Sequence, residues 1–160
     1  MIEVRLHSAR LSAISSCARN GGAVISLCIW PLSVHADGWS EFHARCLSAL
    51  EALVSPVVAG LGDGEATNGV RRYALPDGLH LLVEMTPPDG LSACSVNDPT
   101  GQAEVGFDTW IAEAVAAGRY ILAKPGTWLS NQWTEPVLAV EKHRADVGVT
   151  LRIVETRHEA

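Results

Sequence analysis

The chain has 160 residues, 48% of them hydrophobic and 19% charged, a composition typical of a globular domain with its own core. Its 12 Lys and Arg residues against 18 Asp and Glu give a formal net charge of −6, which argues against binding to nucleic acid through phosphates. The four cysteines include no C-x-x-C pair, so neither thioredoxin-type redox chemistry nor a zinc knuckle is indicated.

Residues 1–36 have the pattern of a secretory signal peptide. Three arginines precede an apolar run at residues 23–36, which ends in a small-residue cleavage site, Val34-His35-Ala36. The run is shorter than the roughly 20 residues that span a bilayer, and Pro31 interrupts it. We therefore expect cleavage after Ala36, a single domain at 37–160 in the periplasm or outside the cell, and no membrane anchor after cleavage. The alternative is a cytosolic acidic protein-interaction domain in which the apolar run forms a buried strand.

Removal of this leader would leave one pair of cysteines, Cys46 and Cys94. An oxidising compartment favours a disulfide between them, whereas in the cytosol two separate buried thiols are expected. The remaining chain would carry 9 basic and 17 acidic residues, a net charge of −8, because the leader contains Arg5, Arg10, Arg19 and Glu3. Such an acidic chain makes nucleic acid an improbable partner.

The first half of the expected domain begins with a helix. Phe42, Cys46, Leu50 and Leu53 form one apolar stripe at helical spacing, with Asp37 or Ser40 as the cap. A glycine-rich loop at 59–69 follows. Three strands are then predicted at 70–75, 79–85 and 91–96, separated by Pro-Asp-Gly turns. Cys46 on the buried helix stripe and Cys94 on a strand face could therefore meet.

The second half repeats this order. Asp98-Pro99 offers a helix start, Phe107 begins an apolar helix face that continues to residue 117, and Gly118 ends it. Strands are predicted at 120–123, 127–133, 137–142 and 147–155, the last with Val147, Val149, Leu151 and Ile153 facing inward. The predicted fold class is α+β, with a mostly antiparallel sheet in the order α-βββ-α-ββββ and both helices on one face. The two halves could be an internal duplication, but no matching residues decide this.

Four side chains are candidates for chemistry. His80 and Glu84 share one strand face, and Glu141 and His143 share another, so neighbouring strands would bring two imidazoles and two carboxylates together. Such a set could bind zinc or act in acid/base catalysis. However, no H-E-x-x-H spacing links them, so a metal or cofactor is not predicted and a solvated sheet face is the simpler interpretation.

The strand predicted at 127–133 is the most suggestive of recognition. It places Ser130, Asn131 and Gln132 between Trp128 and Trp133, and an exposed tryptophan beside amides is typical of binding surfaces. Because the two tryptophans lie five positions apart on a strand, they are expected on opposite faces. Burial of both indoles is the alternative interpretation.

Two classes of function therefore remain from the sequence. The favoured one is a secreted or periplasmic non-enzymatic binding or accessory module for an unknown protein or small ligand. The alternative is a small extracytoplasmic hydrolase, metal-dependent or acid/base, that uses the histidine and glutamate set. The first is favoured because the chain has no G-x-S-x-G elbow and no metal-ligand spacing.

Overall fold

The computed structural model describes residues 37–86, 91–132 and 136–156. The predicted leader, residues 1–36, lies outside the described residues, so its cleavage remains a prediction. All described residues belong to the unit that spans Val34–Ala160.

Three consecutive helical segments form the first element: α1 (Gly38–Phe42), the π-helical turn η1 (His43–Leu47) and α2 (Ser48–Glu51). Asp37 caps the start, since its carboxylate accepts a hydrogen bond from the Ser40 N–H at 2.7 Å. Phe42, Cys46, Leu47 and Leu50 are fully buried. The predicted stripe is wrong at Leu53, which is 61% exposed with a φ of 56°, because the helix has already ended at Glu51.

Four strands follow: β1 (Glu65–Thr67), β2 (Val70–Ala74), β3 (His80–Thr86) and β4 (Leu91–Asp98). The short 3-10 turn η2 (Pro76–Gly78) joins β2 to β3, where turn chemistry was expected. Strand β1 was not predicted, because residues 59–69 were assigned to a loop. Asn68 and Gly69 have φ values of 51° and 80° and connect the paired residues Thr67 and Val70, which is the geometry of a two-residue hairpin.

The second helix, α3 (Ala103–Ala116), follows a turn that the side chain of Asp98 stabilises. Asp98 is 1% exposed, and its carboxylate accepts hydrogen bonds from the Thr100 N–H, the Thr100 hydroxyl and the Ala103 N–H at 2.8, 2.6 and 2.8 Å. The helix ends at Ala116, and Gly118, the predicted stop, follows it two positions later with a φ of 69°. The remaining strands are β5 (Tyr120–Lys124), β6 (Thr127–Ser130), β7 (Val137–Arg144) and β8 (Val149–Thr156).

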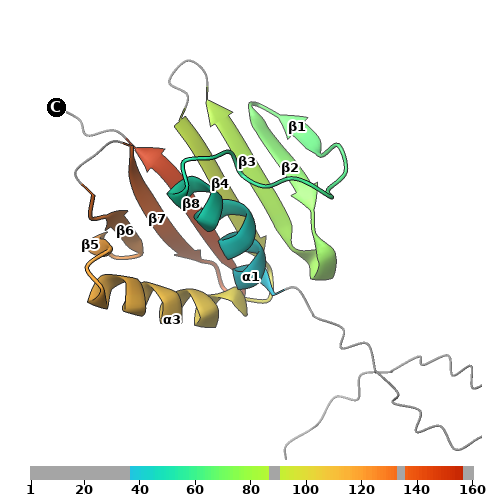
Figure 1. Cartoon of the computed structure of the whole chain (residues 1–160). Coiled ribbons are helices and arrows are strands. Elements are labelled where there is room, and N and C mark those ends of the chain that lie inside the picture. The colour runs from blue at the N-terminus through green and yellow to red at the C-terminus, as the bar shows by residue number, and fades with distance from the viewer. Residues whose placement is uncertain (1–36, 87–90, 133–135, 157–160) are drawn as a thin grey trace, which may run out of the picture. The chain divides into compact units, whose positions relative to one another are not determined.

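The strands of the described residues form one eight-stranded antiparallel sheet in the order β1-β2-β3-β4-β8-β7-β6-β5. Each half of the chain is a helix followed by a four-stranded meander, and the halves meet where β4 pairs with β8. Both helices pack on the same face of the sheet (Figure 1). The predicted α+β class is confirmed, and its strand order needs one addition, β1.

The core lies between the helices and this face of the sheet. Leu81, Val96, Leu151 and Ile153 are fully buried there, beside Phe42 and Phe107 of the two helices. Val147 was predicted to face the core but is 74% exposed, because β8 begins only at Val149 and Val147 lies in the preceding turn. Inward alternation does hold for Val149, Leu151 and Ile153.

The predicted disulfide between Cys46 and Cys94 is confirmed. The two Cα atoms lie 5.4 Å apart, and the bond joins the helical segment to β4 across 48 positions of sequence. Cys94 pairs in register with Val83 on one side and Ile153 on the other, so the bond lies near the middle of the inner face.

The two helices also approach each other closely. Gly106 of α3 lies against Trp39 of α1, where an added Cβ would come within 2.4 Å of the indole Cγ. Trp39 also contacts the rings of Phe107 and Trp110, with centroids 6.1 and 5.7 Å away. Glycine at position 106 therefore permits an aromatic contact that joins α1 to α3.

Candidate functional site

Three of the residues predicted to form a recognition surface line one polar pocket of about 260 Å³. Strand β6 ends at Ser130, before the predicted end at residue 133, and Ser130, Asn131 and Gln132 then face this pocket. The other residues that line it are Glu51, Arg119, Tyr120 and Leu138. The pocket lies between the end of α2 and the starts of β5 and β7.

Hydrogen bonds within the segment hold these three side chains in place. The Asn131 side chain donates to the Gly118 carbonyl at 3.1 Å, and the Asn131 N–H donates to the Arg119 carbonyl at 2.7 Å. The Ser130 hydroxyl accepts from the Leu138 N–H at 2.9 Å. The Gln132 amide donates to Ser130 and to the Pro136 carbonyl, at 3.1 and 3.4 Å. The polar residues therefore shape the turn between β6 and β7 as well as lining the pocket.

An ion pair between Glu51 and Arg119 forms part of the remaining pocket lining. The Glu51 carboxylate accepts a hydrogen bond from the Tyr120 hydroxyl at 3.0 Å and pairs with the Arg119 guanidinium at 3.5 Å. Burial, together with the adjacent Glu51 carboxylate, raises the pKa of Tyr120, so the phenol stays protonated as a donor. Arg119 also lies over the Trp110 ring, 5.8 Å from its centroid, and half of its side chain is exposed.

The tryptophans predicted to flank this surface are placed only in part. Trp128 is partly buried on the inner face, where its ring packs edge-to-face on Phe107 with centroids 5.5 Å apart. Trp128 thus supports the core under β6. Trp133 lies outside the described residues, so the expected exposure of one tryptophan remains a prediction.

Edge strand β5 carries a feature that the sequence analysis missed. Ile121 and Leu122 are 50% and 60% exposed, although both are large and apolar. As adjacent strand residues they point to opposite faces of the sheet. The signal was present in the sequence as two apolar residues directly after Tyr120, but alternation alone does not show that a strand is at an edge. At the other edge, β1 has only three residues, which protects that edge from pairing.

The four residues considered for metal or acid/base chemistry lie on the outer face, the face without helices. Strands β3 and β7 are separated by β4 and β8, and Arg152 of β8 lies between them. Its guanidinium donates to Glu141 at 3.1 Å and to Glu84 at 3.4 Å, and His143 lies 3.4 Å from Glu141.

Arg152 already supplies the positive charge for both carboxylates. Partial burial raises the pKa of Glu141, but the hydrogen bonds from Arg152 and His143 outweigh burial and the pKa is lowered. His80 has no contact with this chain of charges among the residues described here, being paired in register with Asn97 and Ala74. No group of three or more His, Cys, Asp or Glu suited to a metal ion occurs in the described ranges.

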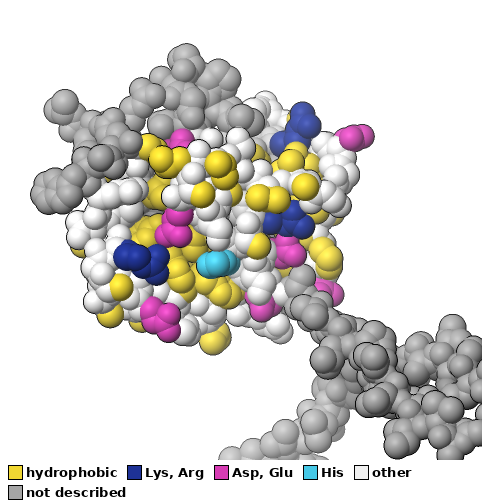
Figure 2. Space-filling view, in the orientation of Figure 1, with side chains coloured by type: hydrophobic (Ala, Val, Ile, Leu, Met, Phe, Trp, Pro, Cys, Tyr) yellow, Lys and Arg dark blue, Asp and Glu magenta, His cyan; other side chains and the backbone are white. Residues whose placement is uncertain are grey.

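Charges of both signs are interspersed on the helix-bearing face, with apolar side chains exposed between them (Figure 2). Among the described residues, no helix has the length and apolar character needed to cross a bilayer. Together, the fold and the pocket define the described part of the chain as a small α+β domain in which a disulfide joins Cys46 to Cys94. No protein-family model, curated protein or solved structure matches the chain.

Proposed function

We propose that the protein is an exported, non-enzymatic binding module that holds an extended segment of a partner protein along edge strand β5. The observation that carries this proposal is the combination of a free sheet edge with two exposed apolar side chains, Ile121 and Leu122, and a polar pocket at the start of the same strand. Addition of a strand to a sheet edge is a common mode of peptide recognition.

The register of β5 indicates which backbone groups are available. The Arg119 carbonyl accepts a hydrogen bond from the Asn131 N–H, so the next residue that bonds to β6 is Ile121, paired with Leu129. The backbone N–H and C=O groups of Tyr120 and Leu122 consequently point away from β6, but Tyr120 is only 2% exposed, so the available groups are those of Leu122, which is 60% exposed. A partner strand would bond to these groups. The pairing would end where the register shifts between Leu122 and Lys124.

Side chains would then determine the preference for a partner. On one face of the added strand, apolar side chains would contact Leu122, and on the other they would contact Ile121. At the start of β5, the half-exposed Arg119 would bind a polar or acidic side chain of the partner.

Export is proposed on separate grounds. The apolar run and small-residue site of residues 1–36 indicate a leader, and an intramolecular disulfide is typical of proteins in oxidising compartments.

Selection of peptides from a displayed random library, followed by affinity measurement with two charge variants, tests the binding proposal. Ile121→Glu and Leu122→Glu should each weaken the selected peptides about tenfold or more, because a carboxylate replaces an apolar contact. Val147→Glu is the matched control: its side chain is also apolar and 74% exposed, but it lies in the turn before β8. Selected peptides that bind the control and the β5 variants equally would show that β5 is not the recognition strand.

A further inference from the structure

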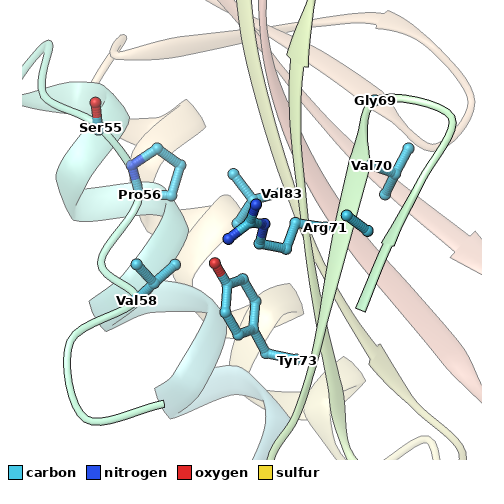
Figure 3. A pocket seen from close by; sticks show the side chains of 9 residues that line it. Ser55, Pro56, Val58, Gly69, Val70, Arg71, Tyr73 and Val83 are labelled. Atoms are coloured by element: carbon cyan, nitrogen blue, oxygen red, sulfur yellow. The ribbon is translucent and has the colours of Figure 1, made fainter. Parts of the chain in front are cut away.

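Figure 3 shows a second cavity, of about 380 Å³, beside β2 and β3. In the strand order, this is the edge of the sheet opposite β5. It is bordered by the segment after α2, by the hairpin of β1 and β2, and by β3, and it opens to solvent on one side. Its walls are mainly apolar and include Pro56, Val58, Ala66, Val70 and Val83. A volume of this size is within the range of small-molecule sites.

The cavity exists because the first helical element ends too early to cover the hairpin. Beyond Glu51 the chain crosses the inner face of β2 and β3 as a loop, and a loop fills less space than a helix. Arg45 holds this loop in position: its guanidinium donates to the Val57 and Ala59 carbonyls at 3.1 and 3.3 Å, and its carbonyl accepts from the Val57 N–H at 2.9 Å. The cavity is therefore preformed.

Two polar groups converge on this apolar space, Arg71 and Tyr73 of β2. Figure 3 shows the Tyr73 hydroxyl directed into the cavity, towards the Arg71 guanidinium. The hydroxyl has no hydrogen bond to another described residue, and the guanidinium donates to the neutral Asp63 carbonyl at 3.3 Å. Within the described ranges, no carboxylate forms an ion pair with Arg71. The cavity thus combines apolar walls, one uncompensated cation and one free hydroxyl.

We propose that this cavity binds a single amphipathic anion, a fatty-acid-like monocarboxylate of medium chain length. The carboxylate accepts hydrogen bonds from Arg71 and Tyr73, and the hydrocarbon body lies against the walls formed by Pro56, Val58 and Val83. At roughly 30 Å³ for each water-sized group, 380 Å³ accommodates about a dozen non-hydrogen atoms, which is the size of decanoate. The proposal is independent of the β5 surface, since the two sites lie at opposite edges of the sheet.

Calorimetric titration of the purified full-length protein with decanoate, and separately with decanol, tests the proposal below the concentrations at which either probe aggregates. Decanol has the same hydrocarbon body without the charge. Decanoate should bind with a stoichiometry of one and about tenfold or more tighter than decanol, because a hydrogen bond to a charged group contributes more than one to a neutral group. Absence of saturable decanoate binding, or equal binding of the two probes, overturns the proposal.

Arginine variants identify the site. Arg71→Met should reduce decanoate affinity about tenfold or more and bring it near that of decanol, and Arg71→Lys should recover part of the loss. Arg72→Met is the matched control, because Arg72 is the adjacent residue on the opposite face of β2, paired with Leu82, and should change affinity less than twofold. Equal losses in Arg71→Met and Arg72→Met would place the carboxylate elsewhere and overturn the assignment.

A filled cavity provides a test that does not depend on charge. Ala66 pairs in register with Arg71 and lies at an exposed edge, so Ala66→Phe places a ring in the cavity without altering the core. This variant should lose both decanoate and decanol binding, while Ile121→Glu on β5 should lose neither. Retention of decanoate binding in Ala66→Phe would contradict the proposed site. Loss of decanoate binding in Ile121→Glu would place the ligand at the β5 surface instead.

Discussion

Removal of the Cys46–Cys94 disulfide should lower the free energy of unfolding by about 4 kcal/mol. The bond closes a loop across 48 positions of sequence, and the chain-entropy model assigns a loop of this length about 4 kcal/mol at 25 °C. Both cysteines are buried, at 0% and 1% exposure, so replacing them by alanine also leaves a small void that costs about 1 kcal/mol. Because a domain of this size has a stability of about 5–15 kcal/mol, the variant should still fold but with a small margin.

Urea denaturation of Cys46→Ala/Cys94→Ala beside the oxidised parent protein measures this difference. The m-value should rise in the variant, because an unfolded chain without the cross-link exposes more surface. The parent protein in strong reductant is the control, and its stability should match that of the variant within about 1 kcal/mol, since it lacks the bond but retains the sulfur atoms. A loss below about 1 kcal/mol with an unchanged m-value would show that the bond does not restrict the unfolded chain.

Three further predictions concern the leader, a buried carboxylate and the contact between the helices. N-terminal sequencing of the protein exported by its own host should begin at Asp37; recovery of an intact Met1 in the exported fraction would contradict the leader. Burial raises the pKa of Asp98, but the hydrogen bonds from Thr100 and from backbone N–H groups outweigh burial and lower it below its ordinary 3.8. The stabilisation is therefore present above that value and lost as pH falls through the folded-state pKa. Asp98→Asn should accordingly cost about 1–3 kcal/mol at pH 7, and the difference from the parent protein should shrink in acid denaturation series below about pH 4. Gly106→Ala should destabilise by about 1–3 kcal/mol in thermal melts, because the clash with Trp39 outweighs the gain of about 1 kcal/mol in helix propensity; a stabilised variant would show that α1 adjusts freely.

The parts of the fold that could be predicted from the sequence are those where burial dominates over local geometry. Phe42, Cys46 and Leu50 recur at helical spacing and are buried, and Leu81 and Val83 alternate along β3 as expected. The same reasoning placed Cys94 on the inner face, which is why the disulfide could be predicted before the sheet order was known.

The wrong predictions concern residues whose burial depends on where an element ends or on the order of strands in the sheet. Leu53 follows the end of a helix, and Val147 precedes the start of a strand. Both are apolar, so the prediction extended the hydrophobic pattern beyond the element and placed them wrongly in the core. Strand β1 is too short and polar for an alternation signal, although Asn68-Gly69 is a strong hairpin signature that could have revealed it.

The candidate sites were less predictable than the fold, because they depend on contacts between distant segments. The Arg152 pairing with both carboxylates follows from β8 lying between β3 and β7, and no local pattern encodes that order. Arg71 occupies an inward position of β2. An inward position normally carries an apolar residue, so an arginine in the sequence suggests the solvent-exposed face instead. Only the early end of the first helical element leaves this position uncovered.

Both cysteines of the disulfide belong to the half of the chain that is made first. The covalent bond requires only residues up to 94, whereas the pairing of β4 with β8 requires residues up to 154. If the chain is exported during synthesis, as proposed above, the first helix and meander would reach an oxidising environment while the second half is still emerging. The thiols can combine at that stage and give a covalently closed half-domain whose β4 edge is still unpaired. Strand β8 then pairs with β4, which the disulfide already holds against the first helix. The slow, long-range pairing therefore starts from an edge strand that is already folded.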